Sequence, residues 1–123
     1  MVTISYMGMM TMQRGEIWLV NLDPTIGSEI RKTGPAVIIS SDLVGILPVK
    51  VIVPFTEWKE RYAQAPWMVK IDPDEQNGLN KSSAADALQI RSVSQQRLVQ
   101  KLGGLPSIQV AKIVQAVMTV LQR

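Results

Sequence analysis

A loop rich in polar and charged side chains lies between two apolar runs near the start of the chain. The apolar runs, residues 16–22 and 35–39, have the composition of β-strands. The loop between them, residues 24–34, is too long for a simple hairpin turn, and long ordered loops on a rigid sheet often carry function. Its polar side chains are Thr25, Ser28, Glu29, Arg31, Lys32 and Thr33.

The amino-acid types that are present limit the chemistry that this loop can support. The 123 residues include no Cys and no His. Disulfides, thiolate or imidazole metal sites and His-based catalysis are therefore excluded. Catalysis would use carboxylates, Lys, Arg, Tyr, Ser or Thr, and we predict neither a metal nor a cofactor.

Composition and charge describe a globular, mildly basic protein. Hydrophobic residues make up 46% of the chain and charged residues 19%, with a net charge of +3. This charge permits a polyanionic partner without requiring one. No apolar run approaches the roughly 18–20 residues that span a bilayer, so we expect a cytoplasmic protein with no membrane contact. We interpret the Met-rich residues 1–12 as a disordered extension, followed by a single domain over residues 13–123.

The remaining chain is typical of short strands separated by turns. We interpret residues 58–64 as a charged loop or a short helix, and residues 79–86 as ambiguous. Ser94 is expected to cap a short helix, and Gly103-Gly104 to break the chain again. The predicted strands share β-branched or aromatic composition and cover residues 16–22, 35–39, 49–54, 66–71 and 87–93.

The last element is predicted to be a helix over residues 108–123, with Ser107 as its N-cap. Apolar residues at positions 110, 113, 114, 117 and 121 follow one helical face. Further apolar residues, such as Ala111, Ala116 and Met118, either bury a second contact with a dimer or partner protein, or are simply exposed. The sequence therefore predicts a mainly β protein with α: a small curled sheet or barrel with one helix packed across it.

Several motifs occur in the order typical of one protein family. They are RGEIWLVNLDP, GSE and PAVIIS within residues 14–40, VIVPFT at 51–56, QIRSVSQQRL at 89–98 and KLGGLP at 101–106. Over about residues 12–123 the chain resembles the MazF/PemK (Kid) toxin endoribonucleases, or mRNA interferases.

The resemblance implies an SH3-like barrel of the CcdB/PemK/MazF toxin type, with about five to seven strands and a C-terminal helix. It also implies a homodimeric toxin of a type II toxin–antitoxin module that cuts single-stranded mRNA without a metal. A MazE-like antitoxin would neutralise it, and operator DNA would bind the complex.

RNA can be cut by its own 2′-hydroxyl, which requires proton removal, charge stabilisation on phosphorus and protonation of the leaving oxygen. In the family, a Thr at the end of the third strand acts with an Arg directly before the Pro of the second strand. Thr56 matches the Thr. Without the resemblance a strand-end capping role would be favoured for Thr56, and with it we favour the site. Gly34 stands where the Arg is expected. Either Arg31 or Lys32 substitutes for it, or the chain is attenuated or inactive.

Two acidic residues are further candidates. Glu29 follows Gly27-Ser28 as in the family and could act as a general base or brace the loop. The family's acidic residue before Gln89 is replaced by Leu88. Asp86 lies two residues earlier, so in a strand it would project to the same face as Leu88 and could substitute, although a solvated strand-end carboxylate is the alternative.

Basic and aromatic residues complete the predicted site. Arg91 could contact phosphate or pair with a carboxylate, and we favour the pair. Trp58 and Tyr62 could stack on unpaired bases, whereas Trp67 within a predicted strand is expected in the core. The predicted catalytic residues are Thr56, Glu29 and Arg31. The predicted RNA-binding residues are Ser28, Lys32, Thr33, Gly34, Trp58, Lys59, Arg61, Asp86 and Arg91.

Two other functions are compatible with the same barrel. One is a non-catalytic module that binds RNA or antitoxin, and the other, less favoured, is a gyrase-poisoning toxin. RNA binding that weakens with salt, without cleavage, would distinguish the first from an enzyme.

Overall fold

The computed structural model describes residues 12–22, 27, 33–44 and 47–122. Short 3-10 turns connect several strands: η1 (Asp42–Val44), η2 (Glu60–Gln64), η3 (Ala87–Gln89) and η4 (Gln95–Arg97). The strands and the helix are β1 (Glu16–Asn21), β2 (Thr33–Ile38), β3 (Val49–Glu57), β4 (Met68–Ile71), β5 (Ser83–Asp86), β6 (Arg91–Ser94), β7 (Leu98–Gly104) and α2 (Ser107–Leu121).

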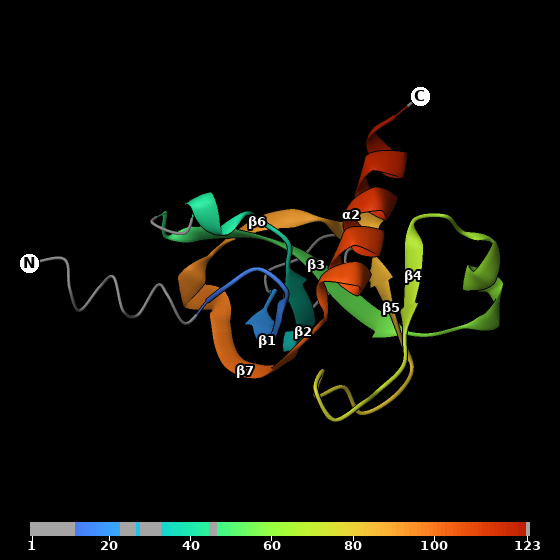
Figure 1. The fold of residues 1–123 in the computed structure, drawn as a ribbon, viewed down its shortest axis with the longest axis horizontal. Coiled ribbons are helices and arrows are strands. Elements are labelled where there is room, and N and C mark those ends of the chain that lie inside the picture. The colour runs from blue at the N-terminus through green and yellow to red at the C-terminus, as the bar shows by residue number, and fades with distance from the viewer. Residues whose placement is uncertain (1–11, 23–26, 28–32, 45–46, 123) are drawn as a thin grey trace, which may run out of the picture.

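The strands form one antiparallel sheet in the order β4-β5-β3-β2-β1-β7, with β6 paired to β3 off this path. Figure 1 shows α2 lying across the sheet near β4 and β5. The predicted mainly β architecture with a C-terminal helix is confirmed. Within the described chain the pairing path is open, so the sheet is not closed into a barrel.

Strand β3 is shared by three partners. On one edge it pairs with β2, through Ile52, Val53 and Pro54. On the other edge it pairs first with β6, up to Ile52, and then with β5, from Phe55 onward. Because side chains alternate along a strand, β3 directs Val53 and Phe55 to one face and Ile52 and Thr56 to the other.

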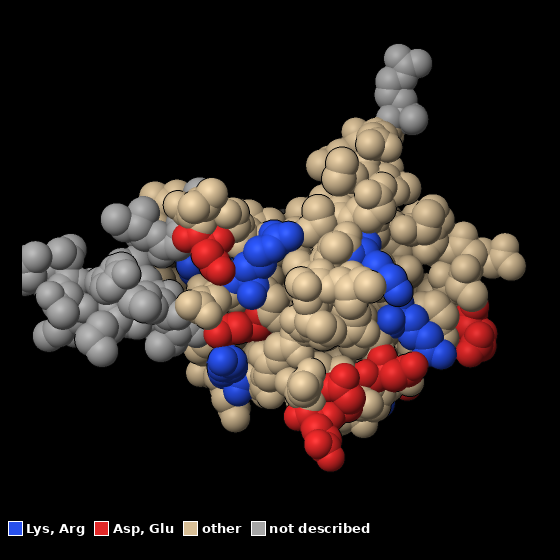
Figure 2. Space-filling model, in the orientation of Figure 1, with Lys and Arg blue, Asp and Glu red and all other residues tan. Residues whose placement is uncertain are grey.

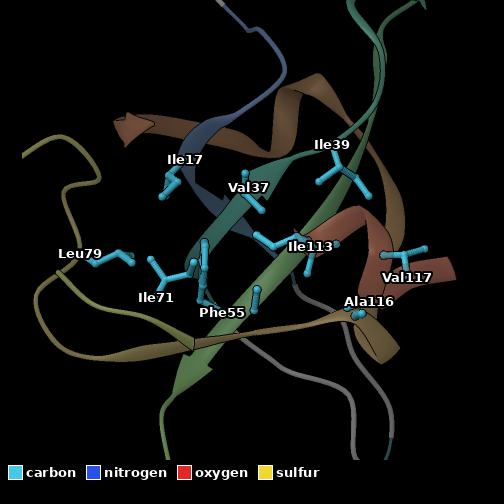
Figure 3. Close-up of a cluster of buried hydrophobic side chains, with 12 residues drawn as sticks. Ile17, Val37, Ile39, Phe55, Ile71, Leu79, Ile113, Ala116 and Val117 are labelled. Carbon is cyan, nitrogen blue, oxygen red and sulfur yellow. The ribbon is translucent and has the colours of Figure 1, made fainter. Parts of the chain in front are cut away.

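A first hydrophobic core lies between the sheet and α2. Figure 3 shows Val37, Phe55 and Ile113 pointing toward one another in its centre. The helix buries Val110, Ile113, Ala116 and Val117, at the spacing of one helical face. Leu121, predicted for that face, is 74% exposed, and Figure 1 shows that only the C-terminal end of α2 projects beyond the sheet. No helix in the described ranges is long and apolar enough to cross a membrane.

A second core covers the opposite face of the sheet. Its buried residues are Trp18, Val20, Leu22, Ala36, Ile38, Ile52, Val93 and Leu98. Strands β1, β2 and β3 therefore contact apolar side chains on both faces. This explains why their sequences are continuous apolar runs rather than alternating ones.

The predicted fifth strand over residues 87–93 is wrong. Thr56 of β3 pairs with Ala84 of β5, whereas Ile52 of β3 pairs with Arg91 of β6. The 3-10 turn η3 lies between β5 and β6 and interrupts the predicted strand. Strand β5 itself lies in the segment whose sequence is ambiguous. Its residues SAAD have low β-propensity, yet all four are buried, so tertiary packing overrides propensity there.

Other boundaries also differ from the prediction. Gly103-Gly104 does not break the chain but ends β7, which pairs with β1. Pro106 is the N-cap of α2 instead of Ser107, with no side-chain cap hydrogen bond. The predicted cap at Ser94 is confirmed, since its side chain accepts from the Gln96 N–H.

A polar turn after β4 anchors the sheet to β7. Asn77 is fully buried; its Oδ1 accepts from the N–H groups of Asp74 at 3.1 Å and Leu79 at 3.0 Å. Its Nδ2 donates to the Asp72 carbonyl at 2.8 Å. The Gly104 N–H then donates to the Gln76 carbonyl at 2.9 Å, so this turn lies directly against β7.

Gly103 is required by this contact, and replacing it tests the anchor. A Cβ at position 103 would lie 2.2 Å from the Gln76 carbonyl oxygen, whereas at Gly104 the nearest atom would be 3.5 Å away. Gly103→Ala should lower the free energy of unfolding by about 2–3 kcal/mol, because backbone must shift to relieve the overlap. Gly104→Ala, the matched control, should cost about 1 kcal/mol or less. Urea unfolding measures both, and equal losses would contradict the anchor.

Candidate active site

Part of the predicted site falls outside the described residues. Ser28, Glu29, Arg31 and Lys32 lie there, and their roles remain predictions. Thr33, predicted in the loop with Gly34, instead begins strand β2, where Gly34 pairs with Val20 of β1.

Thr56 lies near the end of β3, half-buried, on the face of the sheet opposite α2. It pairs with Ala84 of β5, and Ala84 pairs with Lys70 of β4. Directly paired residues project to the same face. Thr56, Ala84 and Lys70 therefore form a row across three strands, called the Thr56 row below.

Gly34 lies on β2, which pairs with β3 on the edge opposite β5. The register of β2 with β3 pairs Ala36 with Pro54, and extending it by two residues on each strand sets Gly34 opposite Thr56. A Cβ built on Gly34 meets none of the described residues within 4 Å. The position is thus open to a larger side chain that would point to the face of Thr56.

Asp86 also lies beside the Thr56 row, although the predicted geometry that relates it to Leu88 is wrong. Leu88 belongs to the 3-10 turn η3 and is 54% exposed, whereas Asp86 ends β5 and is 8% exposed, so they do not share a strand face. Asp86 follows Ala84 by two residues, which makes it a diagonal cross-strand neighbour of Thr56, with Cα atoms about 7–8 Å apart.

The environment of Asp86 favours its protonated form. Burial raises the pKa of the Asp86 carboxyl above its ordinary value, while the hydrogen bond from the Leu88 N–H to Oδ1, at 3.1 Å, partly opposes the shift. A carboxyl whose pKa is raised can exchange a proton closer to neutral pH than an exposed one. The neighbour of Thr56 is thus suited to acid–base chemistry.

An aromatic and cationic cluster extends the row beyond the end of β3. The backbone N–H of Trp58 donates to the Ser82 carbonyl at 3.0 Å, which places Trp58 two residues past Thr56 in the same strand register. Its ring meets Tyr62 edge to face, with centroids 5.9 Å apart. The Lys70 Nζ lies 5.3 Å from the Trp58 ring centroid, and the Arg61 guanidinium carbon 5.3 Å from that of Tyr62.

The other predicted residues are placed as follows. Lys59 is exposed and precedes η2. Trp67 is half-buried and packs against the first core, as predicted. Arg91 lies in β6, and its Nη1 donates to the Leu22 carbonyl at 3.5 Å. Within the described residues Arg91 therefore contacts backbone, and the expected pair with a carboxylate is absent there.

Lys70 is a residue that the sequence does not single out. Alternation along Met68-Val69-Lys70-Ile71 places Lys70 on the face opposite the core, but such alternation cannot identify the neighbouring strand. Its position beside Thr56 depends on the registers of β4 and β3 with β5, whose own segment is ambiguous in sequence.

Charge is mixed on the face that carries α2. Figure 2 shows basic and acidic side chains interspersed there, and α2 itself carries one charged residue, Lys112. Among the described residues no group of three or more acidic side chains could hold a metal ion. The cations around the Thr56 row therefore have to be considered individually.

The raised pKa of Asp86 leads to a pH-dependent prediction. The folded protein holds the Asp86 proton more tightly than the unfolded chain, so the charged carboxylate costs stability at neutral pH and not in acid. Asp86→Asn should therefore stabilise the protein at pH 7, with the gain vanishing near about pH 3, below the ordinary pKa of Asp. The exposed Glu75→Gln is the control. Thermal unfolding across pH measures both, and a gain that persists in acid would contradict the assignment.

Comparison with known proteins identifies the family. A family model of the "PemK-like, MazF-like toxin of type II toxin-antitoxin system" matches residues 13–121. The chain is 32% identical over 111 residues to endoribonuclease MazF9 of Mycobacterium tuberculosis, covering 85% of this chain and 92% of that protein. It is 28% identical over 107 residues to endoribonuclease EndoA of Bacillus subtilis, covering 87% and 91%.

Solved structures agree on the fold. MazF from Deinococcus radiodurans superposes with a TM-score of 0.73 at 22% identity, covering 89% of this chain and 94% of that one. A mycobacterial endoribonuclease in complex with its cognate antitoxin gives 0.69 at 21%, covering 89% and 93%. With the open seven-stranded sheet and the helix across it, these matches show that the chain belongs to the PemK-like, MazF-like toxin family of type II toxin–antitoxin systems.

Proposed function

We propose that this protein is an endoribonuclease of reduced activity that cuts single-stranded RNA by attack of the 2′-hydroxyl. The observation that carries the proposal is the place of Thr56, at the end of β3, with Lys70 in its row and Asp86 as its diagonal neighbour. Relatives named endoribonucleases match most of the chain, which supports the same activity here.

The reaction rearranges bonds at one phosphorus atom. The ribose 2′-oxygen bonds to phosphorus as its proton leaves, and the bond from phosphorus to the 5′-oxygen breaks as that oxygen gains a proton. The products are a 2′,3′-cyclic phosphate and a 5′-hydroxyl. The Thr56 hydroxyl donates a hydrogen bond to a non-bridging phosphate oxygen, where negative charge increases in the transition state. Glu29 is the proposed base, and Arg31 and Lys32 are proposed loop cations.

Reduced activity follows from Gly34. An Arg at this position would grip phosphate with two hydrogen bonds on the face of Thr56, and glycine supplies neither charge nor donor. A Cβ at position 34 would meet none of the described residues within 4 Å, which supports Gly34→Arg as a substitution that the fold accepts.

Cleavage of mixed-sequence RNA in EDTA tests this proposal. The protein should cut slowly, Gly34→Arg should increase the rate about 100-fold, and Thr56→Val, which keeps the shape but removes the donor, should decrease it about as much. No cleavage by the protein or by Gly34→Arg would refute the enzyme. RNA binding that weakens with salt, without cleavage by either, would instead indicate a non-catalytic RNA-binding protein.

The partners proposed for this toxin are single-stranded RNA and an antitoxin. Trp58 and Tyr62 offer ring faces on which unpaired bases could stack beside the Thr56 row. An endoribonuclease of the same fold was solved with its cognate antitoxin, which supports an antitoxin for this chain. Operator DNA is proposed as a partner of the toxin–antitoxin complex.

A homodimer is proposed from the exposed apolar end of α2. Met118 is 45% exposed and Leu121 74%, although α2 is apolar over most of its length. Leu121→Lys should shift the protein toward a monomer in light scattering, because a charge would enter the dimer contact; a lysine near a helix C-terminus is otherwise favourable. Val99→Lys on β7, where Val99 is 61% exposed, is the control. A monomeric wild type at high micromolar concentration would contradict the dimer.

A further inference from the structure

The missing cation at position 34 leaves a question about which group stabilises charge beside Thr56. Phosphoryl chemistry of this kind relies on cations placed where negative charge develops. The described cations differ in how they are engaged and in which way they face. A cation that replaces the missing Arg must lie on the face of Thr56, within reach of its hydroxyl, and must not be paired with a carboxylate.

Several described cations do not meet these conditions. The Lys81 Nζ lies 3.4 Å from a Glu57 carboxylate oxygen, and the Lys101 Nζ lies 3.1 Å from that of Glu16. Arg91 contacts the Leu22 carbonyl. Lys50 shares the face of Thr56 but lies six residues earlier on β3, about 20 Å away at the rise of a strand.

Lys70 shares the face of Thr56, and among the described residues it forms no ion pair with a carboxylate. It occupies the Thr56 row two strands away, with its Cα about 10 Å from that of Thr56 at the spacing of directly paired residues. Between them lies Ala84, which is fully buried. The flexible four-carbon stem of lysine allows the ammonium to move toward β3 on this face.

Trp58 holds the lysine on the correct side. The Nζ of Lys70 lies 5.3 Å from the centroid of the Trp58 ring, a cation–π distance, and Trp58 is the next residue on the same face of the β3 line after Thr56. The ammonium is therefore drawn toward the ring of Trp58, the residue that follows Thr56 on the same face. Lys70 is exposed, so its charge is accessible to a polyanion.

We propose that Lys70 is a catalytic residue of the proposed ribonuclease, supplying the positive charge that Gly34 lacks. The scissile phosphate lies between Thr56 and Lys70, with one non-bridging oxygen accepting from the Thr56 hydroxyl and the other facing the Lys70 ammonium. Lys70 keeps its proton and acts as a point charge, which stabilises the transition state less than the bidentate grip of Arg. This inference rests on the proposed function and explains a residual activity without an Arg.

A double-mutant cycle tests the inference. Lys70→Met is made in the wild-type protein and in Gly34→Arg, and RNA cleavage in EDTA is measured for all four proteins. In the wild type the loss should be about 100-fold, as for removal of one charge-stabilising donor. In the Gly34→Arg background the loss should be much smaller, because the introduced guanidinium already supplies charge to the same phosphate. Lys70→Arg should retain most of the wild-type rate.

Controls separate catalysis from folding and from general electrostatics. Lys112→Met removes the same charge from α2 on the opposite face and should leave cleavage unchanged. Urea unfolding of Lys70→Met shows whether the fold is intact, and compensation by Gly34→Arg is a readout that a purely structural role would not move.

The possible outcomes distinguish this inference from the proposed function. If Gly34→Arg cleaves but Lys70→Met leaves the wild-type rate unchanged, or lowers both backgrounds equally, the role of Lys70 is refuted and the enzyme stands. If the wild type is inactive and only Gly34→Arg cleaves, Lys70 supplies no useful charge and the inference again fails. If no variant cleaves, the proposed function itself fails, and Lys70 with it.

Discussion

The backbone hydrogen bonding of β3 determines where the rest of the sheet lies. Unpaired N–H and C=O groups in a buried strand are costly, so both edges of β3 must find partners along its length. On one edge, β6 pairs with the first part of β3 and β5 pairs with its end, and the residues between β5 and β6 form the 3-10 turn η3. The three last residues of β3 pair with β5 alone, which brings β4 into the same sheet and aligns it with the strand end that carries Thr56.

Much of this arrangement could be predicted from composition, because β-branched runs and a 3.6-residue period are strong local signals. They indicate β1, β2, β3 and α2 with nearly correct bounds. The signals fail at SAAD and at KLGG, where small side chains carry little strand propensity. Burial on both sides determines β5, and contact with the Asn77 turn determines the end of β7, so neither can be inferred from its own residues.

The candidate site, too, can be predicted only in part from the sequence. A motif identifies Thr56, whereas Asp86 is predicted from a strand geometry that the 3-10 turn η3 does not allow. Lys70 belongs to no motif, and its relation to Thr56 exists only through two strand registers. Sequence patterns thus point to residues that a family shares. The structure adds residues that strand pairing places beside them, such as Lys70.

The open space at Gly34 has a genetic consequence. Glycine codons of the form GGN and arginine codons of the form CGN differ in a single base, and a Cβ at this position would meet none of the described residues within 4 Å. If the proposed attenuation by Gly34 holds, a lineage that carries such a gene would be spared most of the burden of a toxic product while retaining the fold. Full activity would then lie one base substitution away, so the gene would be a dormant toxin rather than a lost one.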